Sequence, residues 1–234
     1  MNRTLDKSAA CAINTASMNG KRGAIFDWDG VIINSAKHHD ISWDRLAAES
    51  GYVLPEGHFV KGFGRKNDFI IPEILGWTRD PEEISRLSLR KEEFYREVVR
   101  EIGITALPGV ESWLHTLRDA GVACVIGSST HRKNIVTTLE VLGLEAFFFD
   151  IVSAEDVKQG KPDPEVFLTA AARIGVEPSC GVVFEDALVG IAAAKAASMR
   201  VVAVATTESR EKLAHADWVV DRMDELNVAE LWAN

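Results

Sequence analysis

Acidic, hydroxyl and lysine side chains follow several short apolar runs of this chain, at the points where those runs end. Because the carboxyl ends of parallel strands meet at one edge of a sheet, we expect these side chains to lie close together. They come from four segments: Asp27 and Asp29, then Ser128, Ser129 and Thr130, then Lys161, and last Glu185 and Asp186. The convergence predicts a site in which carboxylates, hydroxyls and one lysine act together.

This combination of side chains predicts phosphoryl transfer with a divalent cation. Several carboxylates in one place repel one another, and a cation relieves the repulsion. Oxygen ligands without cysteine or histidine favour Mg²⁺, which also takes phosphate oxygens as ligands. Ser128 and Lys161 would supply the donors that a phosphoryl group needs. One of the paired aspartates could attack phosphorus while the other, two residues away, moves a proton.

Each segment also has an interpretation without chemistry. The paired aspartates could form a solvated turn, whereas an EF-hand calcium loop is excluded because Val31 and Ile32 occupy positions that need an acid and a glycine. The hydroxyl segment could cap a helix, and Lys161 could be an exposed loop residue. Glu185 and Asp186 could be favourable charges at a helix N-terminus. The four non-chemical interpretations would all have to hold at successive strand ends, and this favours the chemical interpretation.

An alternation of strands and helices must position these residues. Strands are predicted over residues 23–26, 122–126, 147–152, 181–184, 200–205 and 218–220. Helices are predicted over residues 110–120, 131–142, 164–174 and 187–198. Strands that are apolar throughout, each followed by a helix, indicate a parallel sheet buried on both faces. The predicted fold is α/β, with a doubly wound, Rossmann-like parallel sheet as its core.

The stretch between residues 36 and 104 contains no convincing strand. Asp80 is expected to cap a helix that has Pro81 at its first position. Apolar residues then recur on one helical stripe: Ile84, Leu87, Phe94, Val98 and Ile102. We therefore expect an all-helical cap domain of residues 36–104, inserted into an α/β core of residues 23–35 and 105–234.

The ordered motifs resemble those of the haloacid dehalogenase superfamily of aspartate-nucleophile phosphotransferases, over nearly the whole chain from residue 23 to about 226. The resemblance implies that Asp27 is the nucleophile that forms an aspartyl-phosphate and that Asp29 is the general acid/base. It implies phosphoryl binding by Ser128, Ser129 and Lys161. It implies Mg²⁺ binding by Asp27, Asp186 and the backbone carbonyl of Asp29, with Glu185 as a further ligand or a neighbour of the ligands. The acid at position 29 argues against the dehalogenase and phosphonatase branches.

The predicted helical domain resembles the cap of the subgroup that contains β-phosphoglucomutase and related sugar phosphatases. Four residues carry this similarity: His39 and Trp43, one helical turn apart, and Lys61 and Arg65 in a Lys-Gly-x-x-Arg pattern. In that subgroup the matching histidine and arginine contact the sugar phosphate, so we expect all four to bind substrate. His39 could instead be a packing residue, and Lys61 and Arg65 could belong to a solvated face.

Three features refine the functional prediction. Trp28 stands where leucine is usual, and Asn34-Ser35 stands where Asp-Ser or Asp-Thr is common, which bears on substrate fit at the cap hinge. The segment 128–134 resembles the phosphatases, which favours hydrolysis. The leading prediction is a Mg²⁺-dependent phosphatase acting on a small phosphate monoester such as a sugar phosphate. The alternatives are a β-phosphoglucomutase-like phosphomutase and a catalytically idle phosphate-binding protein on the same fold.

The overall composition bounds the partners and the location. The 234 residues include 26 basic and 35 acidic ones, and a formal net charge of −9 argues against nucleic acid as the main partner. No apolar run approaches the roughly 18 residues of a membrane span. We expect a cytoplasmic monomer or weak dimer that acts on a small phosphorylated metabolite and binds neither nucleic acid nor membrane. Residues 1–22 are mostly small and polar, and we expect them to form a disordered tail.

Overall fold

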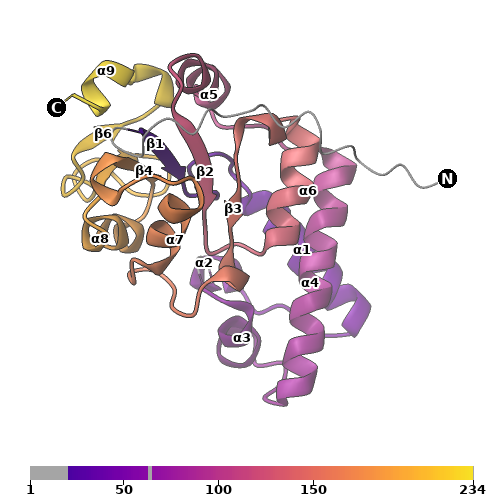
Figure 1. Ribbon diagram of the computed structural model, residues 1–234. Helices are drawn as coiled ribbons and strands as arrows, with labels where there is room; N and C mark the ends of the chain where they lie inside the picture. Colours follow the sequence, from indigo (N-terminus) through magenta and orange to yellow (C-terminus); the bar gives the residue numbers. More distant parts are fainter. Residues whose placement is uncertain (1–20, 63–64, 234) are drawn as a thin grey trace.

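The computed structural model describes residues 21–62 and 65–233, and within them six parallel strands form one sheet in the order β3-β2-β1-β4-β5-β6 (Figure 1). The strands are β1(Gly23–Phe26), β2(Ala123–Gly127), β3(Ile151–Val152), β4(Gly181–Glu185), β5(Arg200–Val204) and β6(Trp218–Val220). Phe26 of β1 lies opposite Ile126 of β2 and Phe184 of β4. The direction of the strand order changes between β1 and β4, which is where such sheets bind ligands. The predicted doubly wound α/β fold is confirmed.

Helices cover both faces of the sheet, because alternate residues of each strand point to opposite sides. On one face, Phe26 packs with residues of α5(Val110–Asp119) and α6(Arg132–Leu142). On the other face, Ile25 packs with residues of α7(Glu165–Arg173) and α8(Leu188–Ala196). Near the C-terminus, α9(Val228–Leu231) adds Leu231 to the first of these cores. The two cores fix the strand ends from which the site is built.

Between residues 36 and 104, the described part of the chain is helical and has an apolar core of its own. Its elements are α1(Ala36–Ser50), α2(His58–Gly62), α3(Asn67–Phe69), the π-helix η2(Ile70–Leu75) and α4(Pro81–Ile102). Its buried centre includes Trp43, Leu46, Ile71, Leu87 and Phe94. Asp80 caps α4, with its side chain accepting a hydrogen bond from the amide of Glu82, and Pro81 follows it as the sequence predicts. We call this part of the molecule the helical unit.

Two segments connect the helical unit to the α/β core, and they lie side by side. Ile33 on the outgoing segment forms a parallel bridge with Asp29 and an antiparallel bridge with Ala106 on the returning segment. The amide of Leu107 also donates a hydrogen bond of 2.8 Å to the carbonyl of Ile32. The helical unit therefore leaves and re-enters the core immediately beside Asp29.

The structure differs from the predicted elements at two places. The strand predicted over 147–152 is reduced to residues 151 and 152, because residues 145–147 form a 3₁₀ turn that closes the connection from α6. Ile102, which we placed on the buried stripe of α4, is 51% exposed because it is the last residue of that helix.

The predicted tail lies outside the described residues except at its end. There, Lys21 and Arg22 donate hydrogen bonds to the carbonyls of Ile174 and Ala120, which tie them to the α/β core. Among the described helices, none combines the length and the apolar character needed to cross a membrane.

Candidate active site

The carboxyl ends of β1 and β4 bring three carboxylates together at one edge of the sheet. One oxygen from each of Asp27, Glu185 and Asp186 lies within 4.8 Å of the others, and all three residues are buried. The amide of Asp27 donates a hydrogen bond of 2.9 Å to the carbonyl of Phe184, so the pairing of β1 and β4 fixes the two strand ends relative to each other. We call these residues the three-carboxylate group.

Lys161 places a positive charge in the three-carboxylate group. Its Nζ donates a hydrogen bond of 2.6 Å to Oδ1 of Asp27 and lies 3.5 Å from Oε1 of Glu185. Burial disfavours the ammonium, but the charges of Asp27 and Glu185 outweigh burial and raise the pKa of Lys161. One ammonium beside three carboxylates leaves the group short of positive charge.

Burial together with this shortage of positive charge raises the pKa values of two of the acids. Burial, followed by the charge of Asp27, raises the pKa of Asp186 to about 7. Burial also raises the pKa of Glu185 well above its ordinary value, although the charge of Lys161 opposes this. Oxygen donors of this kind, buried together and short of cations, fit a Mg²⁺ ion, which would supply the missing charge.

Two glycines leave space for these acids. Gly30 has φ +82°, and a Cβ there would lie 1.9 Å from Oδ2 of Asp186. Gly190 lies in α8, and a Cβ there would lie 1.8 Å from Oε1 of Glu185. The backbone therefore passes so close to both carboxylates that any side chain at these positions would displace them.

The carboxyl group of Asp29 has a different set of partners. The hydroxyl of Ser35 donates to one of its oxygens, and Oγ1 of Thr130 donates to the other at 2.5 Å. Burial raises the pKa of Asp29 against the effect of these two hydrogen bonds. A carboxyl group with a raised pKa, two residues from Asp27, suits the donation of a proton. Because its side chain is turned to these hydroxyls, the metal-binding role expected of Asp29 rests on its backbone carbonyl.

The residues after β2 lie at the same edge of the sheet. Ser128 is buried, and its Oγ accepts a hydrogen bond of 3.2 Å from the amide of Thr130. The amide of Ser128 in turn donates to the carbonyl of Val152 at 2.9 Å, which continues the pairing of β2 and β3. Ser129 is exposed. Thr130 links this loop directly to Asp29.

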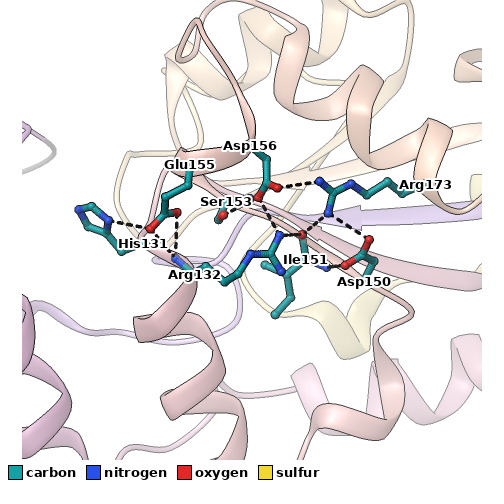
Figure 2. Close-up of polar contacts among 8 residues, drawn as sticks. All are labelled: His131, Arg132, Asp150, Ile151, Ser153, Glu155, Asp156 and Arg173. Carbon is teal, nitrogen blue, oxygen red and sulfur yellow. Dashed lines mark hydrogen bonds and ion pairs between the residues drawn. The ribbon is translucent and has the colours of Figure 1, made fainter. Parts of the chain in front are cut away.

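A charged network fixes the start of α6 to the segment after β3 (Figure 2). Asp156 accepts hydrogen bonds of 2.7 Å from Nη2 of Arg132 and from Nη2 of Arg173. Glu155 accepts a hydrogen bond of 3.1 Å from the backbone amide of Arg132. The network therefore anchors the chain between β3 and the loop that carries Lys161.

Two of the helical-unit residues expected to bind substrate lie on α1 and face α4. The ring of His39 stacks on Tyr95 with ring centroids 4.3 Å apart, and Nδ1 lies 2.6 Å from Nζ of Lys91. Burial and the charge of Lys91 lower the pKa of His39 to about 3. Trp43 is buried in the core of the helical unit, and Nζ of Lys91 lies 5.5 Å from the centroid of its ring.

The other two residues, Lys61 and Arg65, are exposed on the helical unit. Nζ of Lys61 lies 3.5 Å from the carbonyl oxygen of Glu56, and the guanidinium of Arg65 lies 4.9 Å from the ring centroid of Phe69. These contacts are local, and the substrate contacts expected of both residues stay a prediction.

Comparison with known proteins decides the family. A family model described as haloacid dehalogenase-like hydrolase matches residues 24–204, which include all four motif segments and the helical unit. The chain belongs to the haloacid dehalogenase-like hydrolase family. The resemblance of the ordered motifs to this superfamily is confirmed, and the protein is an enzyme of this family.

Relatives of this haloacid dehalogenase-like hydrolase include phosphatases and a phosphomutase. A chloroplastic 5-amino-6-(5-phospho-D-ribitylamino)uracil phosphatase from Arabidopsis thaliana is 35% identical over 215 residues, which are 91% of this chain and 57% of that protein. This chain therefore spans little more than half the length of that relative. The β-phosphoglucomutase of Bacillus subtilis is 30% identical, over 88% of this chain and 92% of its own. The crystal structure of β-phosphoglucomutase from Clostridium difficile matches with a TM-score of 0.75 and 30% identity, covering 90% of this chain and 95% of that one.

Sequence reasoning missed two charged residues of this hydrolase, Lys91 and Glu92 on α4. Both are buried, and Nζ of Lys91 lies 3.1 Å from Oε1 of Glu92. Lys91 also lies close enough to Asp29 for the two charges to interact. The available signal was its position, because Lys91 falls between Leu87 and Phe94 on the buried stripe of α4.

Proposed function

We propose that this protein is a Mg²⁺-dependent phosphatase that hydrolyses a small phosphate monoester, such as a sugar phosphate, through an aspartyl-phosphate at Asp27. The observation that carries this is the environment of Asp27. Its carboxylate lies 2.6 Å from Nζ of Lys161, within a group that includes Glu185 and Asp186. Asp29, with a raised pKa, follows two residues later. A nucleophile, a cation for the phosphoryl group and a proton donor therefore come from one edge of the sheet.

In the first step, a carboxylate oxygen of Asp27 attacks phosphorus, and the bond from phosphorus to the ester oxygen breaks. Asp29, whose raised pKa favours its protonated form, gives its proton to the departing oxygen. Lys161 and the hydroxyl of Ser128 hold oxygens of the phosphoryl group while its charge is redistributed.

In the second step, the Asp29 carboxylate takes a proton from a water molecule, and the oxygen of that water attacks the phosphorus of the aspartyl-phosphate. The bond from phosphorus to Asp27 breaks. Inorganic phosphate leaves, Asp27 is restored as a carboxylate and Asp29 is again protonated. The two steps together add one water to the ester.

The residues that would hold Mg²⁺ are Asp27, Asp186 and the backbone carbonyl of Asp29, with Glu185 as a further ligand or a neighbour of the ligands. When bound, the ion adds positive charge beside the transferring phosphoryl group and relieves repulsion among the acids. The closeness of the three carboxylates and the raised pKa values of Glu185 and Asp186 support this assignment.

In this proposal the helical unit acts as a cap over the α/β core. It places Lys91 close to Asp29, and its connecting segments are paired beside the same residue. Closure excludes bulk water while Asp27 attacks the ester. The contacts expected of His39, Trp43, Lys61 and Arg65 with a small phosphorylated metabolite belong to the same proposal.

A phosphomutase is the second candidate, because a β-phosphoglucomutase is among the relatives. In that reaction a hydroxyl of the substrate, in place of water, would take the phosphoryl group from Asp27. The products distinguish the two reactions, since only hydrolysis releases inorganic phosphate.

The test is a screen of phosphate esters with and without Mg²⁺, in which released phosphate is measured for the wild type, Asp27→Asn and the control Asp119→Asn. Asp119 is exposed and lies outside the site. We expect the wild type and the control to release phosphate with Mg²⁺, and Asp27→Asn to lose about 10³-fold or more in kcat while keeping its circular dichroism spectrum. Activity retained in Asp27→Asn would exclude the covalent mechanism. Conversion of glucose 1-phosphate to glucose 6-phosphate with little free phosphate would show that the enzyme is a mutase and not a hydrolase.

A further inference from the structure

Glu92 is a buried carboxylate outside the three-carboxylate group, and partners from three helices satisfy it. Its Oε1 accepts hydrogen bonds from Nζ of Lys91 at 3.1 Å and from Nδ2 of Asn67 at 2.7 Å. Its Oε2 accepts a hydrogen bond from Nδ2 of Asn134. Burial raises its pKa, but Lys91, His39 and the two amides outweigh burial and lower the pKa to about 2. Glu92 is therefore a buried charge that depends on these partners.

Asn134 is the partner of Glu92 that belongs to the α/β core. It is 1% exposed and lies in the first turn of α6, directly after the loop that follows β2. Its Nδ2 donates to Glu92, and its Oδ1 accepts a hydrogen bond of 2.9 Å from Nη1 of Arg96. Both polar groups of this side chain are thus bonded to α4, which runs alongside α6 (Figure 1). Nη2 of Arg100, bonded to Oγ1 of Thr137 at 3.1 Å, extends the same contact.

Separation of α4 from α6 would break one of the hydrogen bonds of Glu92 and leave the other two intact. The bonds of Glu92 to Lys91 and Asn67 lie within the helical unit and would move with it, whereas the bond to Asn134 crosses to the core. The pairing of Glu92 with Asn134 therefore joins the hydrogen-bonded group inside the helical unit to α6 of the core.

We infer that Glu92 and Asn134 form a latch that holds the helical unit closed on the α/β core. The benefit of this closure for catalysis rests on the proposed function. The latch itself does not, because it is a contact between two parts of the protein.

Thiol labelling tests the latch without substrate. Thr137 is 4% exposed and contacts Arg100 across the α4–α6 interface, so a thiol introduced by Thr137→Cys should react with Ellman's reagent only when the helices separate. The parent protein for the labelling carries Thr137→Cys, and its Cys11 and Cys180 are replaced by serine. Cys124 is retained, because it is buried in the core of the sheet and reports unfolding of the whole molecule.

The variants exchange the donor and the acceptor of the latch. Asn134→Asp replaces the donor to Glu92 by a second carboxylate, and we expect the thiol at residue 137 to react about tenfold faster or more. Glu92→Gln added to this variant restores a hydrogen bond with its direction reversed, and should return the rate to within about threefold of the parent. Asn227→Asp is the matched control, because aspartate caps α9 as well as Asn227 does and the rate should not change.

The latch would be overturned by an unchanged labelling rate at residue 137 in Asn134→Asp. It would also be overturned if the double variant were labelled as fast as Asn134→Asp. Equal acceleration at Cys124 would also overturn it, because it would show loosening of the whole fold in place of separation of two helices. These outcomes hold whether or not the protein is a phosphatase. If phosphate release is observed, Asn134→Asp should raise KM more than it lowers kcat, and the double variant should restore KM. If the wild type released no phosphate, the proposed function would be contradicted, and the labelling result alone would show whether the latch exists.

Discussion

Replacing Gly190 by alanine should not give the stabilisation that this change usually gives in a helix. Alanine is favoured over glycine in a helix interior by about 1 kcal/mol, so the substitution in α8 would ordinarily stabilise the protein. At this position, however, the new Cβ would lie 1.8 Å from Oε1 and 2.0 Å from Cδ of Glu185. Such distances are far below van der Waals contact, and the side chain of Glu185 has to move.

The expected magnitude follows from the burial of Glu185. Its side chain is 2% exposed and lies 3.5 Å from Nζ of Lys161, so it cannot move without disturbing buried neighbours. Overpacking at a buried position costs about 1–3 kcal/mol, which offsets or exceeds the helix-propensity gain. We expect the free energy of unfolding of Gly190→Ala to be unchanged or to fall by up to about 2 kcal/mol. We also expect a loss of activity, because the carboxylate leaves the three-carboxylate group.

Urea unfolding of four proteins checks this reasoning: the wild type, Gly190→Ala, Glu185→Ala and the double variant. Glu185→Ala removes the atoms that would clash. In that background Gly190→Ala should therefore raise the free energy of unfolding by about 0.5–1 kcal/mol. If Gly190→Ala stabilises the otherwise wild-type protein by the same amount and leaves phosphate release unchanged, Glu185 does not lie against residue 190 and the assigned geometry is wrong.

Two other substitutions test charges around the site. The pKa of His39 falls to about 3 on folding, so the stability that its neutral form provides is complete above pH 6.5 and decreases below it by up to about 1.4 kcal/mol per pH unit. Urea unfolding at pH 7 and pH 5 should show this loss of free energy of unfolding in the wild type and in the exposed control His215→Asn, but not in His39→Gln. Equal losses in all three proteins would mean that His39 is not held neutral. Asp156→Asn should lower the free energy of unfolding at pH 7 by about 2 kcal/mol, because Arg132 and Arg173 lose their shared anion. Thermal or urea unfolding measures this loss, and an unchanged midpoint would mean that water replaces the carboxylate at no cost.

The residues at the strand ends could be predicted from the sequence because a parallel sheet leaves little choice. Asp27 follows β1 and Glu185 ends β4, and once both strands are in one sheet their carboxyl ends lie at the same edge. Lys161 is predicted for the same site because its loop follows the third strand, whose carboxyl end lies at the same edge of the sheet. Local patterns and one rule of topology were enough for this part of the site.

The contacts between the helical unit and the core could not be predicted in this way. The stripe on α4 shows which face of the helix is buried, but the pairing of Glu92 with Asn134 depends on how that helix lies against α6. Arg96 of α4 likewise reaches Asn134 of α6 from 38 positions away in the sequence. No spacing along the chain encodes such a contact, because it follows from packing between elements that form independently.

The excess of acid in this chain and its proposed anionic substrate fit together through Lys161. Its ammonium lies 2.6 Å from an oxygen of Asp27, which stabilises that carboxylate and makes it a weaker nucleophile. In the proposed reaction the oxygens of the phosphoryl group compete with Asp27 for the same ammonium, and the carboxylate is released from this contact only as the ester arrives. In the proposed reaction the group that binds the anion is thus also the group that restrains the nucleophile, so that Asp27 would become reactive when a phosphate monoester is in place.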